Sequence, residues 1–266
     1  MLNQYKECIK DADLVLIGVG RELDAKTLIP MDGDEVRNYY KEKGMHGYED
    51  LLALPESKGR NRLLEAYYRA YLLSMEHFPL YDDLVEALEG KNYFVITSNQ
   101  DNLLYKTGLR DDRICIPCGS GEFFQCSKPC EHKLYPALPG IEALINYYEA
   151  NGQLEWLQCP NCGEDFLFNV RNEDTVGCYV EEGYLQRWGY YTKWLQGTIN
   201  KKVVILELGE GFELPNLFKW PFEKIVTYNF KSKLIRVHET LAMATPETKE
   251  RTEIVAKNSR EFLLEH

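Results

Sequence analysis

The sequence predicts an α/β protein built around an open, mainly parallel sheet. Short unbroken apolar runs, typical of strands buried on both faces, occur at residues 14–18, 93–97 and 203–206. Amphipathic stretches separate these runs, as expected of helices that connect parallel strands. Polar residues follow each run. Because ligands bind at the carboxyl ends of strands in such sheets, those polar residues are the first candidates for a functional site.

The first third of the chain supports this interpretation. Residues 14–18 enter the sheet after two aspartates. Residues 24–60 are polar and repeatedly interrupted by proline and glycine, which predicts a surface excursion with at most short helices. Apolar residues at steps of three and four then predict a helix over 61–77. A second helix is expected over 80–89, ending at Gly90.

The middle of the chain departs from the alternating pattern. After the strand at 93–97, a short strand is expected at 113–116, followed by a cysteine-bearing segment with an amphipathic helix at 141–150. The aromatic run at 179–194 suits either a substrate groove or the packing between domains, and packing is the favoured reading.

The last quarter returns to alternation. The strand at 203–206 is followed by a helix started by Pro221 and by a strand at 234–237. The final stretch, 247–264, is charged with scattered apolar positions and predicts a solvated surface helix. The chain therefore contributes at least four strands to the predicted sheet.

Composition excludes several classes of function. The 266 residues hold 31 Lys and Arg against 42 Asp and Glu, a net charge of −11, without a dense basic cluster. Nucleic acid is therefore not an expected partner. No apolar run approaches the roughly 20 residues that span a bilayer, and the N-terminus lacks a signal-peptide core, so we expect a cytoplasmic protein without a membrane partner.

Four of the eight cysteines have the spacing of metal ligands. Cys126 and Cys130 form a Cys-x3-Cys pair, and 28 residues later Cys159 and Cys162 form a Cys-x2-Cys pair. Four thiolates close the coordination sphere of a tetrahedral ion, so Zn²⁺ bound here is expected to be structural. The alternative is a set of unrelated buried or redox cysteines.

Two strand ends carry candidate ligand-binding residues. Gly18 and Gly20 follow the first strand and would let a pyrophosphate approach the backbone, although an ordinary tight turn explains them equally well. Arg21 either contacts a phosphate or faces water. Asn99 and Asp101 follow a later strand, where an amide and a carboxylate can hold a carboxamide or sugar hydroxyls. Asp101 also suits a simple helix cap.

Cys118 lies at a third strand end, before Gly119 and Ser120. It is either a small buried hydrophobe, which its sequence context favours, or a thiol at the mouth of a ligand site. The remaining cysteines lack partners at ligand spacing and are assigned to the core. These are Cys8, Cys115 and Cys178.

In this order, the motifs resemble those of the sirtuin family of NAD-dependent deacylases and ADP-ribosyltransferases. The family's Gly-Ala-Gly turn, Asn-x-Asp segment, paired cysteines and late Gly-Thr/Ser turn are matched by Gly18-Val19-Gly20, Asn99-Gln100-Asp101, the four cysteines above and Gly209-Glu210-Gly211. Residues 93–108, 125–130 and 206–222 are most similar to the bacterial branch associated with macrodomains.

The resemblance implies a domain organisation. A Rossmann-like NAD-binding domain would comprise residues 1–120 and 179–266, with a loop and helical insert at 24–78. A small zinc-binding domain would comprise residues 121–178. The implied cofactors are NAD and structural Zn²⁺.

The resemblance also implies a role for each site residue. Gly18, Gly20 and Arg21 would contact the NAD phosphates, Asn99 the nicotinamide ribose, and Asp101 the carboxamide, next to Gln100. The adenosine would be surrounded by three residues from the end of the chain: Gly209, Glu210 and His238.

The chain departs from the family at two places. Cys118 stands where most sirtuins carry a catalytic histidine, and the usual Asp-Phe-Arg segment is missing from residues 21–40. A thiol with a pKa of about 8.5 is mostly protonated at neutral pH and is a poor base, so deacylation is disfavoured. Cleavage of the nicotinamide bond depends mainly on positioning and electrostatics and does not require that base.

The resemblance therefore implies a protein ADP-ribosyltransferase, with Asn99 and Cys118 as its catalytic pair. The alternatives are an NAD hydrolase and a degenerate protein that binds NAD or ADP-ribose without turnover. The implied partners are a protein substrate, with a lipoate-carrier protein as one candidate, and a macrodomain hydrolase.

Overall fold

Six parallel strands form the main sheet of the structure, a computed structural model that describes residues 2–128 and 130–265. Their order across the sheet is β3-β2-β1-β7-β8-β9, so the first strand in sequence lies near the centre. Every neighbouring pair is parallel. The strands are β1 (Leu14–Val19), β2 (Tyr93–Thr97), β3 (Ile114–Cys115), β7 (Val203–Leu208), β8 (Lys233–Val237) and β9 (Thr252–Val255).

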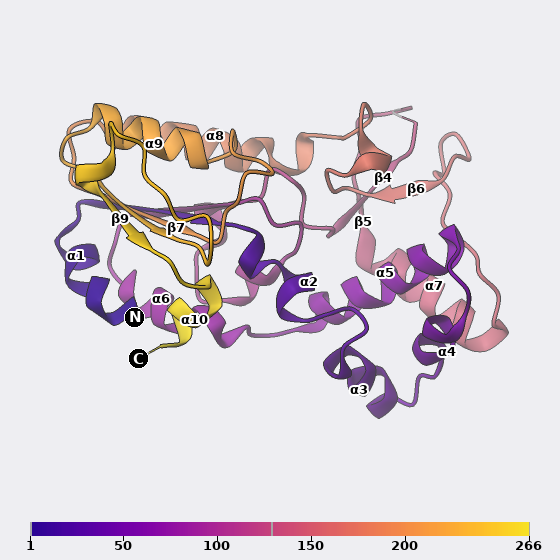
Figure 1. Ribbon diagram of the computed structural model, residues 1–266. Coiled ribbons are helices and arrows are strands. Elements are labelled where there is room, and N and C mark those ends of the chain that lie inside the picture. The colour runs from indigo at the N-terminus through magenta and orange to yellow at the C-terminus, as the bar shows by residue number, and fades with distance from the viewer. Residues whose placement is uncertain (1, 129, 266) are drawn as a thin grey trace.

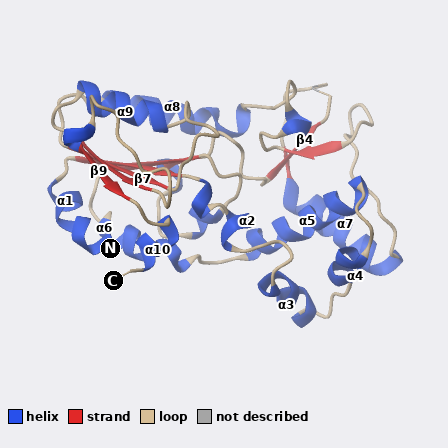
Figure 2. Cartoon of the chain, in the orientation of Figure 1, coloured by secondary structure: helices blue, strands red, loops and turns tan. Residues whose placement is uncertain are grey.

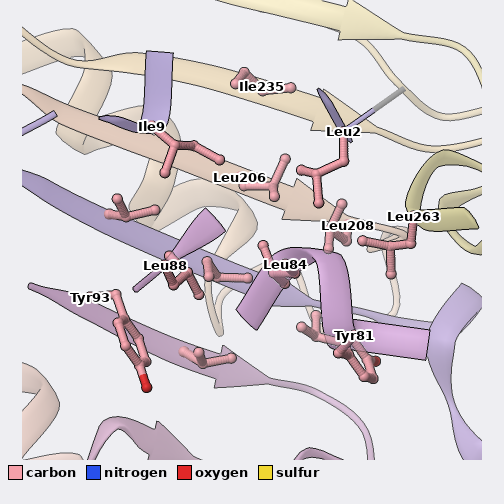
Figure 3. Packing of buried hydrophobic residues seen from close by; sticks show 14 of the residues in the cluster. Leu2, Ile9, Tyr81, Leu84, Leu88, Tyr93, Leu206, Leu208, Ile235 and Leu263 are labelled. Atoms are coloured by element: carbon pink, nitrogen blue, oxygen red, sulfur yellow. The ribbon is translucent and has the colours of Figure 1, made fainter. Parts of the chain in front are cut away.

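Helices cover both faces of this sheet (Figures 1 and 2). One face is covered by α8 (Glu182–Gln196) and α9 (Lys219–Tyr228), and the other by α1 (Lys6–Asp11), α6 (Asp82–Ala87) and α10 (Ser259–Leu264). Figure 3 shows the second face, where Leu206 and Leu208 of β7 pack in one cluster with Leu84 of α6 and Leu263 of α10. The central strands are thus buried on both sides, which explains their unbroken apolar sequences.

A second hydrophobic cluster lies beyond the sheet, on the right of Figure 1. It joins two segments that are far apart in sequence, because Tyr67 of α5 and Phe124 and Ile141 of the cysteine-bearing segment are all buried in it. Its helices are α2 (Ala25–Leu28), α3 (Asp34–Glu42), α4 (Gly47–Ala53), α5 (Lys58–Ser74) and α7 (Ala137–Asn151). Its antiparallel sheet has the order β5-β4-β6, from Tyr135–Pro136, Phe123–Cys126 and Phe166–Phe168.

The predicted strands are confirmed, with shifts of one or two residues at their ends. The helix expected over 61–77 begins earlier, at Lys58, because the Ser57 hydroxyl accepts the Arg60 N–H and caps it. The helix expected over 80–89 is shorter, since a 3-10 turn at Pro79–Tyr81 precedes α6. The aromatic run packs on the sheet: Tyr191 and Trp194 contact Phe94.

The prediction of a single surface helix over 247–264 is wrong. The segment forms a 3-10 turn at Lys249–Arg251, then the edge strand β9, and only then α10. Of the four residues of β9 only Val255 is buried, while Glu253 forms an exposed ion pair with Lys233 of β8. An edge strand with this pattern has the composition of a solvated helix. Within the described part of the chain, no helix has the length and apolarity needed to cross a membrane.

Candidate functional site

The carboxyl ends of β1, β2 and β7 meet at one edge of the sheet. The Ser98 hydroxyl donates to Glu210 Oε2 at 2.6 Å, which joins the end of β2 to the end of β7. The Thr97 hydroxyl donates to Val19 O at 2.8 Å, and Gly20 N donates to Leu208 O at 2.7 Å. The structure therefore brings together the three polar segments that the sequence placed at strand ends.

Gly18, near the end of β1, and Gly20, directly after it, are required for this convergence. A Cβ on Gly20 would lie 2.5 Å from the backbone of Gly209 and Glu210, and a Cβ on Gly18 would lie 2.6 Å from Phe218 and Phe222. Both residues thus let neighbouring chain segments pack closely. Because the Gly20 amide already donates to a strand carbonyl, close packing accounts for these glycines without a pyrophosphate.

Asn99 lies 3% exposed just beyond β2, with its N–H donating to Thr97 Oγ1. Its side-chain Oδ1 is buried and has no hydrogen-bond partner among the described residues. The same is true of Asn102 Nδ2 and Glu210 Oε1. Orphaned buried polar atoms cost free energy and are rare, so three of them beside strand ends suit a bound polar ligand.

Asp101 is held by two backbone donors. Its Oδ2 accepts the Ala25 N–H at 2.9 Å and its Oδ1 accepts the Leu103 N–H at 3.0 Å. Burial, with a smaller contribution from Asp24, raises the pKa of Asp101 to about 6. The carboxylate thus anchors the start of α2 to the end of β2, whereas the N-cap of α2 itself is Asp24. Its neighbour Gln100 donates from Nε2 to Arg171 O.

Arg21 lies beside acidic residues. Its guanidinium is 3.2 Å from Glu213 and 3.6 Å from Asp24, and its side chain is 39% exposed. It is the first basic residue after β1, and its charge lowers the pKa values of Glu210 and Cys118.

Glu22 is a site residue that the sequence did not reveal. Its Oε2 accepts the N–H and the hydroxyl of Ser259, both at 2.8 Å, and its Oε1 accepts the Glu239 N–H at 2.8 Å. His238 Nδ1 lies 3.3 Å from the same carboxylate and accepts the Thr240 N–H. Glu22 therefore ties the turn after β1 to the end of β8 and to α10. No local signal marks it, because its partners are more than 200 residues away.

Cys118 lies three residues after β3 and is 3% exposed. Burial raises the pKa of its thiol to about 11, even though Arg171 and Arg21 act in the opposite direction. The Cys118 carbonyl accepts the Arg171 N–H at 2.8 Å, which fixes the backbone there. The thiol is therefore protonated at neutral pH and cannot act as a general base.

The four ligand-spaced cysteines form one cluster next to the small antiparallel sheet. All four Sγ atoms lie within 4.8 Å of one another, with Cys126 and Cys162 at 3.4 Å and Cys130 and Cys159 at 3.6 Å. A tetrahedral Zn²⁺ with bonds of about 2.3 Å separates its sulfur ligands by about 3.8 Å. The donor set and its spacing fit a structural zinc ion.

Comparison with solved structures identifies the architecture. A Sir2 homologue in complex with NAD matches with a TM-score of 0.54 and 14% identity, over 98% of this chain and 90% of that one. A Sir2 protein bound to a propionylated peptide matches with a TM-score of 0.53 and 18% identity, over 98% and 95%. The chain has the sirtuin fold. In both comparisons the likeness extends over nearly the whole chain.

Two curated proteins are similar to this chain in sequence. A "Protein ADP-ribosyltransferase" of Staphylococcus aureus is 23% identical over 84% of this chain and 73% of its own length. A "Probable bifunctional ADP-ribose hydrolase/ADP-ribosyltransferase" of Fusarium oxysporum is 29% identical over 60% of this chain. The match spans 28% of the length of the fungal protein. No protein-family model matches the sequence.

Proposed function

We propose that this protein is an NAD-dependent protein ADP-ribosyltransferase. The sirtuin fold and the names of both curated relatives support an enzyme of this class. The observation that carries the proposal is the group of orphaned buried polar atoms beside the strand ends, Asn99 Oδ1 and Glu210 Oε1 above all. A ligand rich in hydroxyl and amide donors, such as NAD, would satisfy both oxygens.

In this proposal the predicted residues surround NAD at the edge of the sheet. Asn99 holds the nicotinamide ribose, Gln100 and Asp101 lie at the carboxamide, and Arg21 offsets the phosphate charge. Gly209, Glu210 and His238 surround the adenosine, and the Glu22 carboxylate lies 3.3 Å from His238 Nδ1. NAD supplies the ADP-ribosyl group, and the chain contributes orientation and charge.

The reaction breaks the bond between nicotinamide and ribose. Nicotinamide leaves with the electron pair of that bond, and a nucleophile of the acceptor protein bonds to the same ribose carbon and loses its proton. The buried Asp101 carboxylate, next to the carboxamide, stabilises the positive charge that develops on the ribose. Because Cys118 is a protonated thiol, deacylation lacks its base and transfer is favoured.

The proposal also names partners and a location. The acceptor is a protein in the cytoplasm, with a lipoate-carrier protein as the first candidate to test. A macrodomain hydrolase would reverse the modification, in keeping with the fungal relative, whose name joins an ADP-ribose hydrolase to an ADP-ribosyltransferase. Zn²⁺ on the four cysteines has only a structural role.

Release of nicotinamide from NAD tests the proposal. The wild-type protein with cell extract should release nicotinamide, and Asn99→Ala should lower the rate at least tenfold, since Asn99 lies at the bond that breaks. Chromatographic quantification of nicotinamide is the measurement. NAD that stays intact with every extract would contradict the proposal.

A second function is favoured by one observation, the buried and protonated Cys118. It is that of a protein that binds NAD or ADP-ribose without turnover. Calorimetric binding of NAD without nicotinamide release would support it, whereas turnover that is lost in Asn99→Ala would exclude it.

A further inference from the structure

Arg69 of α5 reaches two loops of the proposed site. It is 6% exposed, and its Nη1 donates to Gln100 O at 3.2 Å and to Ser120 O at 3.3 Å. These carbonyls lie one residue after Asn99 and two residues after Cys118. A single guanidinium from outside the sheet thus joins the ends of β2 and β3.

A third segment, the helix α2 that follows β1, is joined to Arg69 through ion pairs. Arg69 Nη2 lies 2.7 Å from Glu65 Oε1, and Glu65 Oε2 lies 3.0 Å from Lys26 Nζ in the segment that follows β1. Burial alone would raise the pKa of Glu65, but Arg69 and Lys26 outweigh it and lower that pKa. Glu65 is therefore ionised at neutral pH, and the chain Lys26–Glu65–Arg69 remains charged.

The surroundings leave room for this guanidinium and little else. Gly121 has φ +72°, and a Cβ there would lie 1.7 Å from Arg69 Nη1 and 2.4 Å from its Cζ. On another side, the Arg69 guanidinium lies 4.8 Å from the centre of the Phe168 ring. The glycine at 121 and the arginine at 69 are thus fitted to each other.

We propose that Arg69 is a positioning residue. This inference rests on the proposed function in one respect, namely that the loops held by Arg69 carry Asn99 and Cys118. Its planar, permanently charged fork donates to two carbonyls at once while it pairs with Glu65. Lysine has a single point charge and cannot reproduce that geometry. Because Arg69 acts on the loops and touches neither side chain, its loss should disturb their alignment with NAD more than the binding of NAD.

Arg62 is a matched control. It lies on α5 seven residues before Arg69, so it is on the same face of the helix. It also has an ion pair, 2.6 Å to Asp165, and an aromatic contact, 5.3 Å to the Trp156 ring. Neither of these two contacts involves the loops after β1, β2 or β3.

The first measurement is steady-state nicotinamide release by the full chain. Arg69→Met should lower kcat at least tenfold with less than a threefold change in KM for NAD, while Arg62→Met should change neither by more than twofold. Arg69→Lys should recover only part of the loss. Equal kcat values in Arg69→Met and Arg62→Met, per mole of folded protein, would overturn the inference.

The second measurement does not depend on activity. Hydrogen exchange in the peptides covering 97–104 and 117–122 should be at least fivefold faster in Arg69→Met than in Arg62→Met. Unchanged exchange in both peptides would overturn the inference even if the wild type released no nicotinamide. Conversely, a wild type without turnover but with this difference in exchange would overturn the proposed function and leave the role of Arg69 supported.

A double-mutant cycle tests the fit between Arg69 and Gly121. Gly121→Ala should destabilise the wild type strongly, because its Cβ meets the guanidinium in addition to adopting an unfavourable φ. In the Arg69→Ala background only the backbone strain remains, so the same substitution should cost less. Additive costs would show that the two residues are independent and would contradict the inference.

Discussion

Glu210 is a carboxyl residue of the candidate site whose pKa lies well above its usual value. It is 1% exposed, and burial raises its pKa to about 7. The Ser98 hydrogen bond, Arg21 and Lys219 lower that pKa, while Glu207 raises it further. Folding therefore shifts this carboxyl group toward its protonated form.

This shift makes stability depend on pH. A carboxyl group whose pKa rises on folding contributes stability below its unfolded value of about 4.5, and that contribution is lost as pH rises through about 7. We expect Glu210→Gln to match the wild type near pH 4.5 and to be more stable by about 1–3 kcal/mol at pH 8. Urea unfolding across this range measures it. Asp101 titrates in both proteins, so its contribution cancels in the difference between their free energies of unfolding. Parallel curves of unfolding free energy against pH would contradict the raised pKa of Glu210.

The elements β7, β8 and α9 are joined by a buried ion network. Glu207 of β7 accepts from Lys219 Nζ at 3.0 Å and from Arg236 Nη2 of β8 at 2.9 Å. Arg236 Nη1 also donates to Glu223 of α9 at 2.8 Å. Such a network stabilises the fold little more than well-packed apolar side chains of the same volume would. Removing one member, however, leaves an uncompensated buried charge and lowers stability.

Arg236→Met should therefore lower the free energy of unfolding by about 3–5 kcal/mol, because Glu207 and Glu223 lose a buried partner. Lys233 begins the same strand and pairs with Glu253 at the surface, so Lys233→Met should cost less than about 1 kcal/mol. Thermal or urea unfolding of both variants gives the comparison. Similar losses in the two variants would show that the buried network does not act as described.

Elements could be predicted from sequence where burial leaves a local pattern. The apolar runs of β1, β2 and β7 revealed the sheet because both faces of these strands are covered. By contrast, β9 is an edge strand with one buried residue, and its sequence predicts part of a helix. Asn99 could be placed at a strand end by the same logic, whereas Glu22 and Arg69 could not. Their roles depend on partners that are distant in sequence, and a charged residue alone reads as surface.

At the scale of the whole molecule, the four cysteines lie beside a hydrophobic cluster to which residues 25–75 and 124–170 both contribute. Cys126 and Cys159 are buried together with Phe124 of β4 and with side chains of α5 and α7. A metal ion that closes the loop between the two cysteine pairs would stabilise both of these segments, since binding free energy becomes folding free energy.

Metal analysis of the purified protein should give one Zn²⁺ per chain. Cys126→Ser should lose the zinc and lower the unfolding temperature, because one of four ligands is removed. Cys8→Ser is the control. Cys8 lies in α1 and packs against the hydrophobic cluster of the main sheet, not against the cluster that contains Cys126 and Cys159. Native protein without zinc, or Cys126→Ser with a full complement, would contradict the structural role.

The destination of the ADP-ribosyl group tests the central claim most directly. The protein is incubated with cell extract and NAD labelled in its adenylate phosphate, and the label is followed into protein, free ADP-ribose and acyl-ADP-ribose. The account predicts label in an acceptor protein that appears together with free nicotinamide and is absent with Asn99→Ala. Label found only in free ADP-ribose, or only in acyl-ADP-ribose, would contradict it.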